Sequence, residues 1–475
     1  LVGWEMCIRD RAGAGRHSRK DAARAFGRTH GPAPAQGGRA NGQLRAEGAS
    51  CESSSTVPER RAADLPEEQR VIFHCDCNSF YASVELLRYP ELRGVPVAVC
   101  GSPDDRHGII LAKNEPAKRY GVQTAETVWS ALRKCPGLKL LPPHHGQYRE
   151  MSRAVNAIYA RYTDRIEPFG IDESWLDMTQ TWRLFGSSPA GVADAVRRAV
   201  KAETGLTISV GVSFNKVFAK LGSDYKKPDA VTVIDTENFR RIVWPLPVNT
   251  LLYVGRSAQN TLAGLGVRNI GQLAAAKDED LRAALGKLGP ELGAYARGEE
   301  NSPVRTADER PEIKSVGNGL TFKRNLVGEA DVRAGLYALA DEVATRLRAH
   351  GLYAAAVQVL IKNPDLKSIS RQKPLPWPSH LAREIGGAAL ELVKANWSLD
   401  APIRMLTVTA LNLTDGREGR QLSLLEPERP RNEKRERLEQ SLDAIRRKYG
   451  KTSIAPGNVI KNDIGLEDIE IEEKP

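Results

Sequence analysis

The residues best suited to chemistry are two adjacent acids, Asp172 and Glu173, in the segment 165–177 (RIEPFGIDESWLD). Short apolar runs flank the pair, and Pro168 and Gly170 indicate a tight turn just before it. Along a strand, neighbouring side chains point to opposite faces, so consecutive acids usually diverge. At a turn or a strand end this rule relaxes, and both carboxylates could then approach one divalent cation. A solvated hairpin tip is the alternative for this segment taken by itself.

A third acid, Asp76, follows the apolar run 71–75. That run is typical of a buried strand, and a helical pattern begins at Phe80, capped by Asn78 or Ser79. A strand holds the carboxylate at its end near the edge of a sheet, which is a common place for a metal ligand. An Asp that only caps the following helix is the alternative.

Lysine-rich segments follow a strand that we expect over 206–212. They are 213–221 (SFNKVFAKL) and 224–229 (DYKKPD). Acids from two places on one sheet, with lysines nearby, match the arrangement that two-metal phosphoryl transfer requires. In that chemistry one cation activates the attacking 3′-oxygen and the other holds the triphosphate. Lysines supply point charges for the phosphates.

Composition narrows the class of protein. The chain has 475 residues, enough for about three domains and tails. No apolar run approaches the roughly 20 residues of a membrane helix, so no membrane association is expected. The net charge of +10 favours a polyanionic partner, although many basic proteins bind no nucleic acid. Six cysteines do not make a disulfide framework in so long a chain. We expect Cys75 and Cys77 to be reduced, buried thiols on opposite faces of a strand, as in a cytoplasmic protein.

The remaining elements follow from apolar periodicity. Up to about residue 235, strands and helices alternate without strict β-α-β repetition, which favours an α+β sheet covered on one face. The further elements expected here are strands at 95–100 and 108–112 and helices at 114–120, 148–162 and 189–204. After Lys314 the order becomes β-α-β-β-α-β, the split β-α-β plan. It comprises strands at 315–322, 354–361, 367–373 and 403–411 and helices at 331–350 and 379–397. In the helix at 331–350, one face should carry an apolar stripe of Leu336, Leu339, Val343 and Leu347.

Segments 76–84, 170–173 and 209–229 together resemble the Y-family DNA polymerases, in the polymerase IV branch. The similarity covers about residues 70–425, and the run NKVFAK at 215–220 is its most specific part. The resemblance implies a multidomain α+β right-hand polymerase with palm, fingers, helical thumb and β-α-β-β-α-β little finger. It divides the chain into palm at 69–78 and 145–235, fingers at 79–144, thumb at 236–311, little finger at 312–418 and a tail at 419–475. Residues 1–68 are rich in Gly, Ala, Arg and Ser without a helix or strand period, and we expect them to be a disordered or non-native leader.

The resemblance also implies a metal centre. Asp76, Asp172 and Glu173 match the family's catalytic, metal-binding carboxylates. The backbone carbonyl of Cys77 matches an additional ligand. Two Mg²⁺ ions are expected in the active site.

The resemblance also implies which residues contact the incoming nucleotide. Tyr81 matches the steric gate that rejects a ribose 2′-hydroxyl, with an ordinary core aromatic as the alternative, and Phe80 would pack under the incoming sugar. Lys227 matches a triphosphate contact. Lys118 stands where many members have Arg, and Glu115 stands where they have Tyr. Because Glu115 would repel phosphate, we expect it to point away or to pair with a neighbouring cation.

The implied DNA contacts are less specific. The thumb, at 251–298, would grip the backbone through a helix-hairpin-helix turn, but Tyr253 replaces the usual glycine, and a plain helical bundle is the alternative. In the little finger the candidate phosphate contacts, without base readout, are Lys323, Arg324, Lys367, Arg371 and Lys373. For each of these taken singly, an ordinary solvated cation is the alternative.

The tail contains Gln421-Leu422-Ser423-Leu424-Leu425. Gln421, Leu422, Leu424 and Leu425 resemble the peptide by which bacterial polymerases dock on the sliding clamp. A five-residue match can also arise by chance. A charged helix at 432–449 and an acidic, disordered end at 463–473 are expected after it.

We therefore expect a template-directed translesion DNA polymerase without proofreading, acting in DNA damage tolerance and repair. Its expected partners are primer–template DNA, deoxynucleoside triphosphates and the sliding clamp. It would be a monomer in the bacterial cytoplasm, associated with the nucleoid. A catalytically silent, clamp-binding scaffold of the same family is the first alternative, although such a relative would lose the carboxylates. A palm-like nucleotide cyclase is the second, and it would need neither thumb nor little finger.

Overall fold

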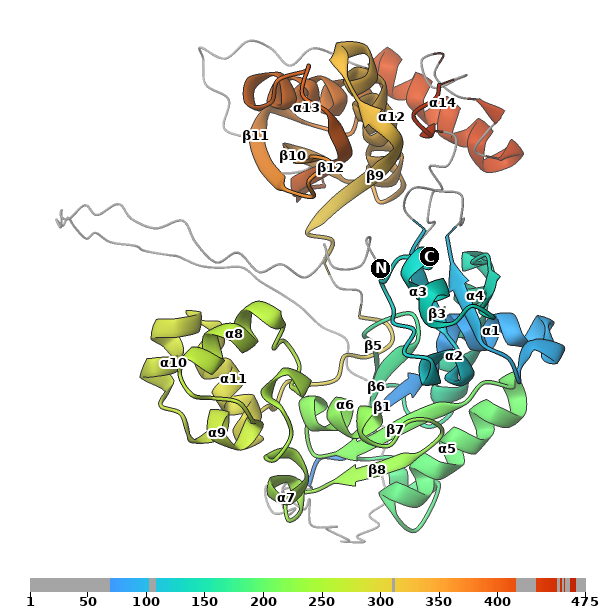
Figure 1. Ribbon diagram of the computed structural model, residues 1–475, viewed down its shortest axis with the longest axis vertical. Coiled ribbons are helices and arrows are strands. Elements are labelled where there is room, and N and C mark those ends of the chain that lie inside the picture. The colour runs from blue at the N-terminus through green and yellow to red at the C-terminus, as the bar shows by residue number, and fades with distance from the viewer. Residues whose placement is uncertain are drawn as a thin grey trace, which may run out of the picture. The chain divides into compact units, whose positions relative to one another are not determined.

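The computed structural model describes residues 69–101, 108–309, 312–415, 433–450, 453–454, 457 and 462–466 (Figure 1). The expected leader at 1–68 and the expected clamp peptide at 421–425 lie outside the described residues. Within the described part, the predicted mixture of helices and several separate sheets is confirmed. No helix of that part is long and apolar enough to cross a membrane.

A five-stranded sheet carries the acidic residues, in the order β5-β6-β1-β7-β8. Its strands are β1 (Ile72–Cys77), β5 (Ile166–Pro168), β6 (Glu173–Asp177), β7 (Ile208–Ser213) and β8 (Val231–Ile234). The central strand β1 is antiparallel to both β6 and β7, and β8 runs parallel to β7. The expected hairpin over 165–177 is confirmed as the antiparallel pair β5–β6.

One face of this sheet is apolar and packs against helices α1 (Phe80–Arg88), α4 (His145–Tyr159) and α5 (Pro189–Thr204). Phe73, Cys75 and Cys77 belong to this core. The expectation that the two cysteines face opposite sides is therefore wrong, because residues two apart on a strand share a face. Both thiols are free and buried, as expected. Ser79 occupies the N-cap of α1 but makes no capping bond with its side chain.

The opposite face is also covered in part, so the expectation of a sheet covered on one face is wrong. Helix α6 (Lys216–Tyr225) packs across β1, β7 and β8 (Figure 1). Gly211 makes this possible, since a Cβ there would lie 1.8 Å from the carbonyl oxygen of Ala219. The helix backbone thus rests directly on the strand, and side chains of α6 reach the acidic residues beside it.

A small second sheet lies in the segment after α1. Its order is β3-β2-β4, with β2 (Val97–Cys100), β3 (Ile110–Lys113) and β4 (Lys139–Leu141). Helices α2 (Glu115–Arg119) and α3 (Val128–Lys134) accompany it, and the 3-10 turn η2 (Pro90–Leu92) precedes it. Ala98, Ile110 and Ala131 belong to its own apolar core.

A helical unit follows β8. It contains α7 (Phe239–Val243), α8 (Arg256–Gly264), α9 (Ile270–Ala275), α10 (Asp278–Leu285) and α11 (Leu288–Arg297). Its core includes Leu262, Leu273 and Leu292 and also takes in Phe218 from α6. The 3-10 turns η3 (Trp182–Leu184) and η4 (Val248–Thr250) complete this half of the chain.

The expected split β-α-β order is confirmed in the second half. The sheet order is β11-β10-β12-β9, and all neighbouring strands are antiparallel. Its elements are β9 (Ser315–Leu326), α12 (Gly328–Ala349), β10 (Tyr353–Lys362), β11 (Ser368–Ser379), α13 (Ala382–Asn396) and β12 (Ile403–Thr414). The predicted stripe on α12, with Leu336, Leu339, Val343 and Leu347, is fully buried.

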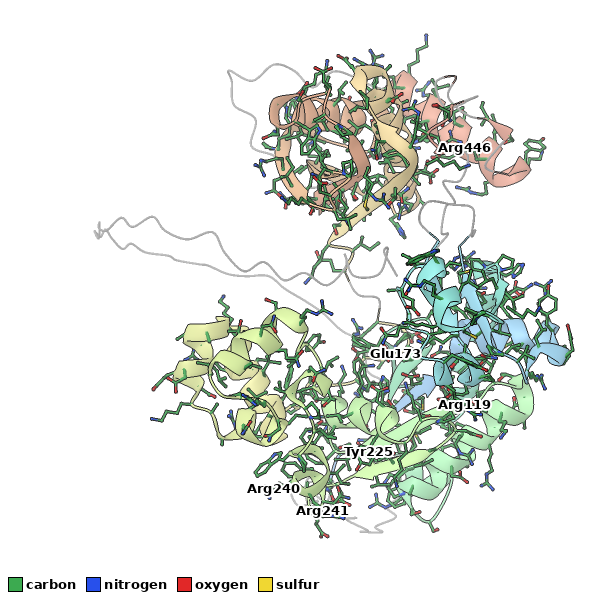
Figure 2. The ribbon with its side chains drawn as sticks, viewed as in Figure 1. Arg119, Glu173, Tyr225, Arg240, Arg241 and Arg446 are labelled. Carbon is green, nitrogen blue, oxygen red and sulfur yellow. The ribbon has the colours of Figure 1, made fainter. Side chains whose placement is uncertain are left out.

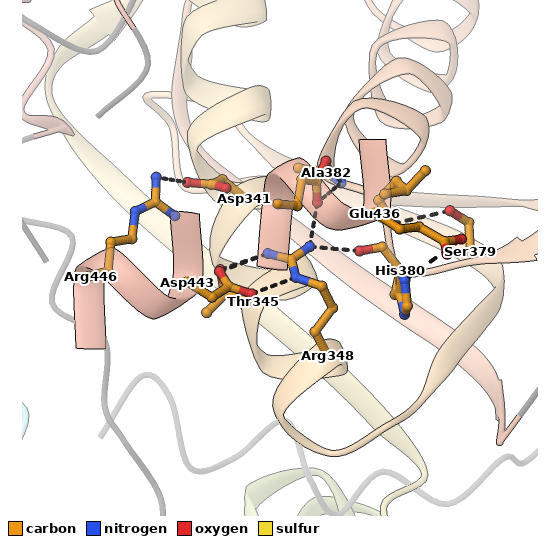
Figure 3. Close-up of polar contacts among 11 residues, drawn as sticks. Asp341, Thr345, Arg348, Ser379, His380, Ala382, Glu436, Asp443 and Arg446 are labelled. Atoms are coloured by element: carbon orange, nitrogen blue, oxygen red, sulfur yellow. Dashed lines mark hydrogen bonds and ion pairs between the residues drawn. The ribbon is translucent and has the colours of Figure 1, made fainter. Parts of the chain in front are cut away.

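Two later segments pack on this unit. Helix α14 (Glu433–Tyr449) confirms the expected charged helix and lies against α12 and α13 through polar contacts (Figure 3). None of its residues is buried. Residues 462–466 return to β9, where Ile464 and Leu466 enter the apolar core. The expectation that disorder begins at 463 is therefore wrong for residues 463–466.

Candidate active site

The acids meet at one end of the central strand. Asp76 lies directly opposite Glu173 in the β1–β6 register, so their side chains share a face of the sheet. Asp172 precedes β6, and its carbonyl oxygen accepts a 2.9 Å hydrogen bond from the backbone N–H of Cys77. The fold therefore brings together residues almost a hundred positions apart, as the motif predicted. Figure 2 marks Glu173 within this part of the structure.

The turn before the acids is shaped around them. The backbone N–H groups of Phe169 and Gly170 both donate to the carbonyl oxygen of Glu173, at 3.0 and 3.3 Å. A Cβ at Gly170 would lie 3.2 Å from Cγ of Glu173 and 3.3 Å from Oδ1 of Asp172. Glycine thus leaves room for both acidic side chains to fold over the turn.

A candidate metal site of three groups lies here. Among the described residues, His74, Asp76 and Glu173 each offer a ligand atom, and these atoms all lie within 4.8 Å of one another. Asp172 is not in that set. His74 is fully buried, its Nδ1 lies 2.8 Å from Oγ of Ser223, and its Nε2 lies 3.4 Å from Oε2 of Glu173. Clustered carboxylate oxygens of this kind suit a hard divalent cation, so the residues fit a metal.

Burial and mutual repulsion set the charges of the acids. Burial, with the charges of Asp76 and Glu173, raises the pKa of Asp172 to about 7. Burial likewise raises the pKa of Asp76, opposed by Lys227. Burial alone would raise the pKa of Glu173, but His74 and Lys220 outweigh it and lower this pKa to about 2. Three acids with such different proton affinities in one place are typical of a functional site.

Two lysines counter this negative charge. The ammonium of Lys220 bonds to Oε2 of Glu173. Nζ of Lys227 lies 2.8 Å from Oδ2 of Asp76 and 2.7 Å from Oδ1 of Asp224. Burial would lower the pKa of Lys227, but the two aspartates prevail and raise it to about 12. Lys227 is therefore a permanent cation beside Asp76.

The two predicted sugar contacts follow directly on β1. Phe80 and Tyr81 open helix α1, with ring centroids 5.8 Å apart. Phe80 is buried in the apolar core, whereas Tyr81 is only partly buried. Tyr81 also stacks on Tyr148 of α4, with ring centroids 4.1 Å apart.

Glu115 is paired, as expected. Its Oε1 lies 2.5 Å from Nζ of Lys118 at the next turn of α2. The acid therefore neutralises the lysine that was expected to hold phosphate. The role of Lys118 in nucleotide binding stays a prediction.

The turn before α8 has a left-handed backbone conformation of the kind that glycine usually adopts, but the residue there is Tyr253. Tyr253 has φ of 68°, in the left-handed region, and its side chain is exposed. Gly255 then occupies the N-cap of α8. The departure in sequence is thus accommodated without losing the left-handed turn.

Several candidate DNA contacts already have partners. The guanidinium of Arg324 bonds both to Asp331 and, through two 2.7 Å bonds, to Asp463. Arg371 donates to Oδ1 of Asn396 at 3.1 Å. Nζ of Lys373 lies 2.5 Å from Oε2 of Glu391. Their DNA contacts stay predictions.

Sequence reasoning missed His74 and Lys220 as parts of the site. His74 lies two residues before Asp76 and therefore shares its face of β1, which is a usable signal. Lys220 lies in the motif at 215–220, but only the packing of α6 across β1 brings it to Glu173.

The comparisons with known proteins agree with the motifs. The impB/mucB/samB family matches residues 75–224, and its C-terminal domain matches residues 313–424. A protein of Acetivibrio thermocellus named DNA polymerase IV is 46% identical over 398 residues, covering 84% of this chain and 99% of that protein. The chain belongs to the Y-family of DNA polymerases. It falls in the polymerase IV branch, as expected.

Other matches agree with this family membership. DNA polymerase IV 1 of Bacillus subtilis is 36% identical over 400 residues, covering 84% of this chain and 95% of the relative. A chimeric Y-family DNA polymerase of known structure is 21% identical and superposes with a TM-score of 0.63 over 72% of this chain and 98% of its own. That match confirms the fold of a multidomain Y-family polymerase.

Proposed function

We propose that this chain is a template-directed DNA polymerase of the translesion type. It adds deoxynucleotides to a primer 3′-end by two-metal nucleotidyl transfer and does not proofread. Membership of the polymerase IV branch supports the reaction. The observation that carries the mechanism is the register of β1 and β6, which sets Asp76 opposite Glu173 with Asp172 beside them.

In this proposal Asp76, Asp172, Glu173 and the backbone carbonyl of Cys77 hold Mg²⁺, in two positions. The ions, when bound, lower the pKa of the primer hydroxyl and offset charge on the triphosphate. The protein supplies the fixed geometry. Strands β1 and β6 hold Asp76 and Glu173 on one face, so the backbone positions of both acids are fixed before a cation binds. With a pKa raised to about 7, Asp172 is only partly ionised near neutral pH, and it is the ionised carboxylate that would bind a cation.

Nucleotide binding is assigned to residues around these acids. Lys227 is a fixed cation beside Asp76 and supplies charge for the triphosphate, while Lys118 does so from α2. Tyr81 excludes the 2′-hydroxyl of a ribonucleotide, and Phe80 supports the sugar.

The wider assignments follow the same family pattern. We propose the palm, fingers, thumb and little finger at the boundaries predicted above, with Lys323, Arg324 and Arg371 touching the DNA backbone. Arg324 would have to exchange Asp463 or Asp331 for a phosphate. Gln421, Leu422, Leu424 and Leu425 would dock on the sliding clamp. The enzyme would act as a monomer in the bacterial cytoplasm, at the nucleoid.

Primer extension tests this function. The full chain is incubated with primer–template DNA and deoxynucleotides, with Mg²⁺ or with chelator, on undamaged and damaged templates. Asp172→Asn combined with Glu173→Gln should abolish extension and leave primer–template binding nearly intact. The matched control is Asp177→Asn, at the far end of β6, where the carboxylate accepts a 3.0 Å hydrogen bond from the N–H of Thr179. DNA binding without extension by the wild-type chain would instead support the silent scaffold.

A further inference from the structure

An aromatic stack lies behind the proposed gate. The rings of Tyr81 and Tyr148 are nearly parallel, with centroids 4.1 Å apart and 11° between their planes. His145 stands edge-on to both, with centroids 5.9 Å from Tyr81 and 5.6 Å from Tyr148. Tyr148 is fully buried, so it cannot retreat from Tyr81 without disturbing the core.

Helical spacing explains why these groups meet. Tyr81 and Glu85 lie four residues apart on α1 and therefore share a face. His145 and Tyr148 lie three residues apart on α4 and also share a face. Because these two faces pack together, one aromatic pair and one acid–tyrosine pair form side by side.

The position of Tyr148 is itself held by hydrogen bonds. Its hydroxyl donates to Oε1 of Glu85 at 2.5 Å and accepts from the backbone N–H of His144 at 3.0 Å. Glu85 is fully buried, and Nδ1 of His144 lies 2.9 Å from the same Oε1. Burial, together with Glu85, raises the pKa of Tyr148, so the hydroxyl remains a neutral donor. The ring behind Tyr81 is thus fixed at its far end.

We propose that Tyr148, held by Glu85, is a positioning residue for Tyr81 and sets how strictly ribonucleotides are rejected. This inference rests on the proposed function, because Tyr81 must be the gate. A gate works by repulsion, which requires that its ring cannot move away when a 2′-hydroxyl presses on it. The Tyr148 ring blocks one direction of that movement, and His145 limits another.

The test measures sugar discrimination, the ratio of kcat/KM for a deoxynucleotide to that for the matching ribonucleotide, in single-nucleotide primer extension. Tyr148→Leu removes the stacked ring and should lower the ratio about three- to tenfold, the range expected for one stacking contact. Tyr148→Phe keeps the ring but loses the bond to Glu85, so its ratio should lie between wild type and Tyr148→Leu. His145→Ala, at a partly exposed site, should lower the ratio without opening a cavity in the core.

A matched control separates the loss of ring positioning at Tyr81 from a general loss of fold stability. Tyr159 is also a fully buried tyrosine of α4 and packs in the same core, but it lies eleven residues further along the helix than Tyr148. Tyr159→Leu should lower the melting temperature about as much as Tyr148→Leu and leave the ratio unchanged. An equal loss of discrimination in both variants would overturn the inference.

Failure of the inference is distinguishable from failure of the proposed function. If the wild-type chain does not extend a primer, the proposed function is wrong, and the inference that rests on it is wrong too. If Tyr81→Ala discriminates between the sugars as well as wild type does, Tyr81 is not the gate, and Tyr148 has no gate to position. If Tyr81→Ala relaxes discrimination while Tyr148→Phe and His145→Ala keep the wild-type ratio, the gate stands and the positioning role is wrong.

Discussion

Asp76 and Glu173 face each other across β1 and β6, and each carboxylate contacts a different lysine, Lys227 and Lys220 respectively. The charged centre is therefore balanced by ammonium groups that come from α6 and the segment just after it. Asp172 has no such partner among these lysine contacts, and its pKa is the one that burial raises to about 7.

The stability of the metal-free protein should depend on pH through Asp172. Its folded pKa of about 7 exceeds the ordinary value, so the folded protein keeps a proton that the unfolded chain releases near pH 4. The contribution of Asp172 to the free energy of unfolding is fully present below about pH 4. It is lost as the pH rises to about 7. Asp172→Asn should remove this loss and stabilise the metal-free protein at pH 8, by up to roughly 4 kcal/mol.

Thermal unfolding between pH 5 and pH 8, with chelator and then with Mg²⁺, checks this. Mg²⁺ should stabilise wild type more than Asp172→Asn, because the variant has lost a ligand. Asp177→Asn serves as control. Equal stabilisation of wild type and Asp172→Asn by Mg²⁺ would contradict the role of this acid.

Lys227 should act on the nucleotide. Lys227→Ala removes a cation held between Asp76 and Asp224, and the KM for deoxynucleotides should rise roughly tenfold. The Mg²⁺ concentration for half-maximal activity should not rise, since Asp76 loses a competing cation. Steady-state extension measures both quantities. Lys226→Ala, which changes an exposed neighbour, is the control. If the two variants have the same KM for deoxynucleotides, Lys227 does not bind the nucleotide.

Gly211 should be intolerant of even a methyl group. A Cβ there would lie 1.8 Å from the carbonyl oxygen of Ala219 and 2.5 Å from the backbone nitrogen of Ser223. Gly211→Ala must push α6 off the sheet, which should cost roughly 3 kcal/mol of unfolding free energy. It should also weaken catalysis, because α6 carries Lys220. Gly264→Ala, where no atom lies within 4 Å of the new Cβ, is the control. Similar denaturation midpoints for the two variants would argue against the close packing of α6.

The attachment of α14 should depend on charge. Arg348 has a side chain only 5% exposed, and it bonds to Glu439 and Asp443 of α14 and to the carbonyl oxygen of His380 (Figure 3). Since α14 buries no apolar residue, Arg348→Met should release it, and high salt should weaken it in wild type. Limited proteolysis within 433–450 measures this release.

Arg333→Met, which removes an exposed pair with Glu329, should leave the proteolysis pattern of α14 unchanged. Full protection of α14 in Arg348→Met at all salt concentrations would show that other contacts hold it.

The sequence alone determined the acids and the family. Asp76 and the pair at 172–173 stand in local motifs whose flanking apolar runs predict the strands that carry them, and the β-α-β-β-α-β order follows from periodicity. Periodicity even predicted the buried stripe of α12. Local pattern also predicted that Glu115 would pair, because its partner lies on the same helix face.

The tertiary structure alone decided which distant faces meet. Three features depend on contacts between segments far apart in the chain. Helix α6 lies on the second face of the sheet, Tyr148 stacks on Tyr81, and Arg348 bonds to Glu439 of α14. Apolar spacing shows which side of an element is buried but not what buries it. Polar pairs between distant segments carry no periodic signal, so their partners become known only when the chain is folded.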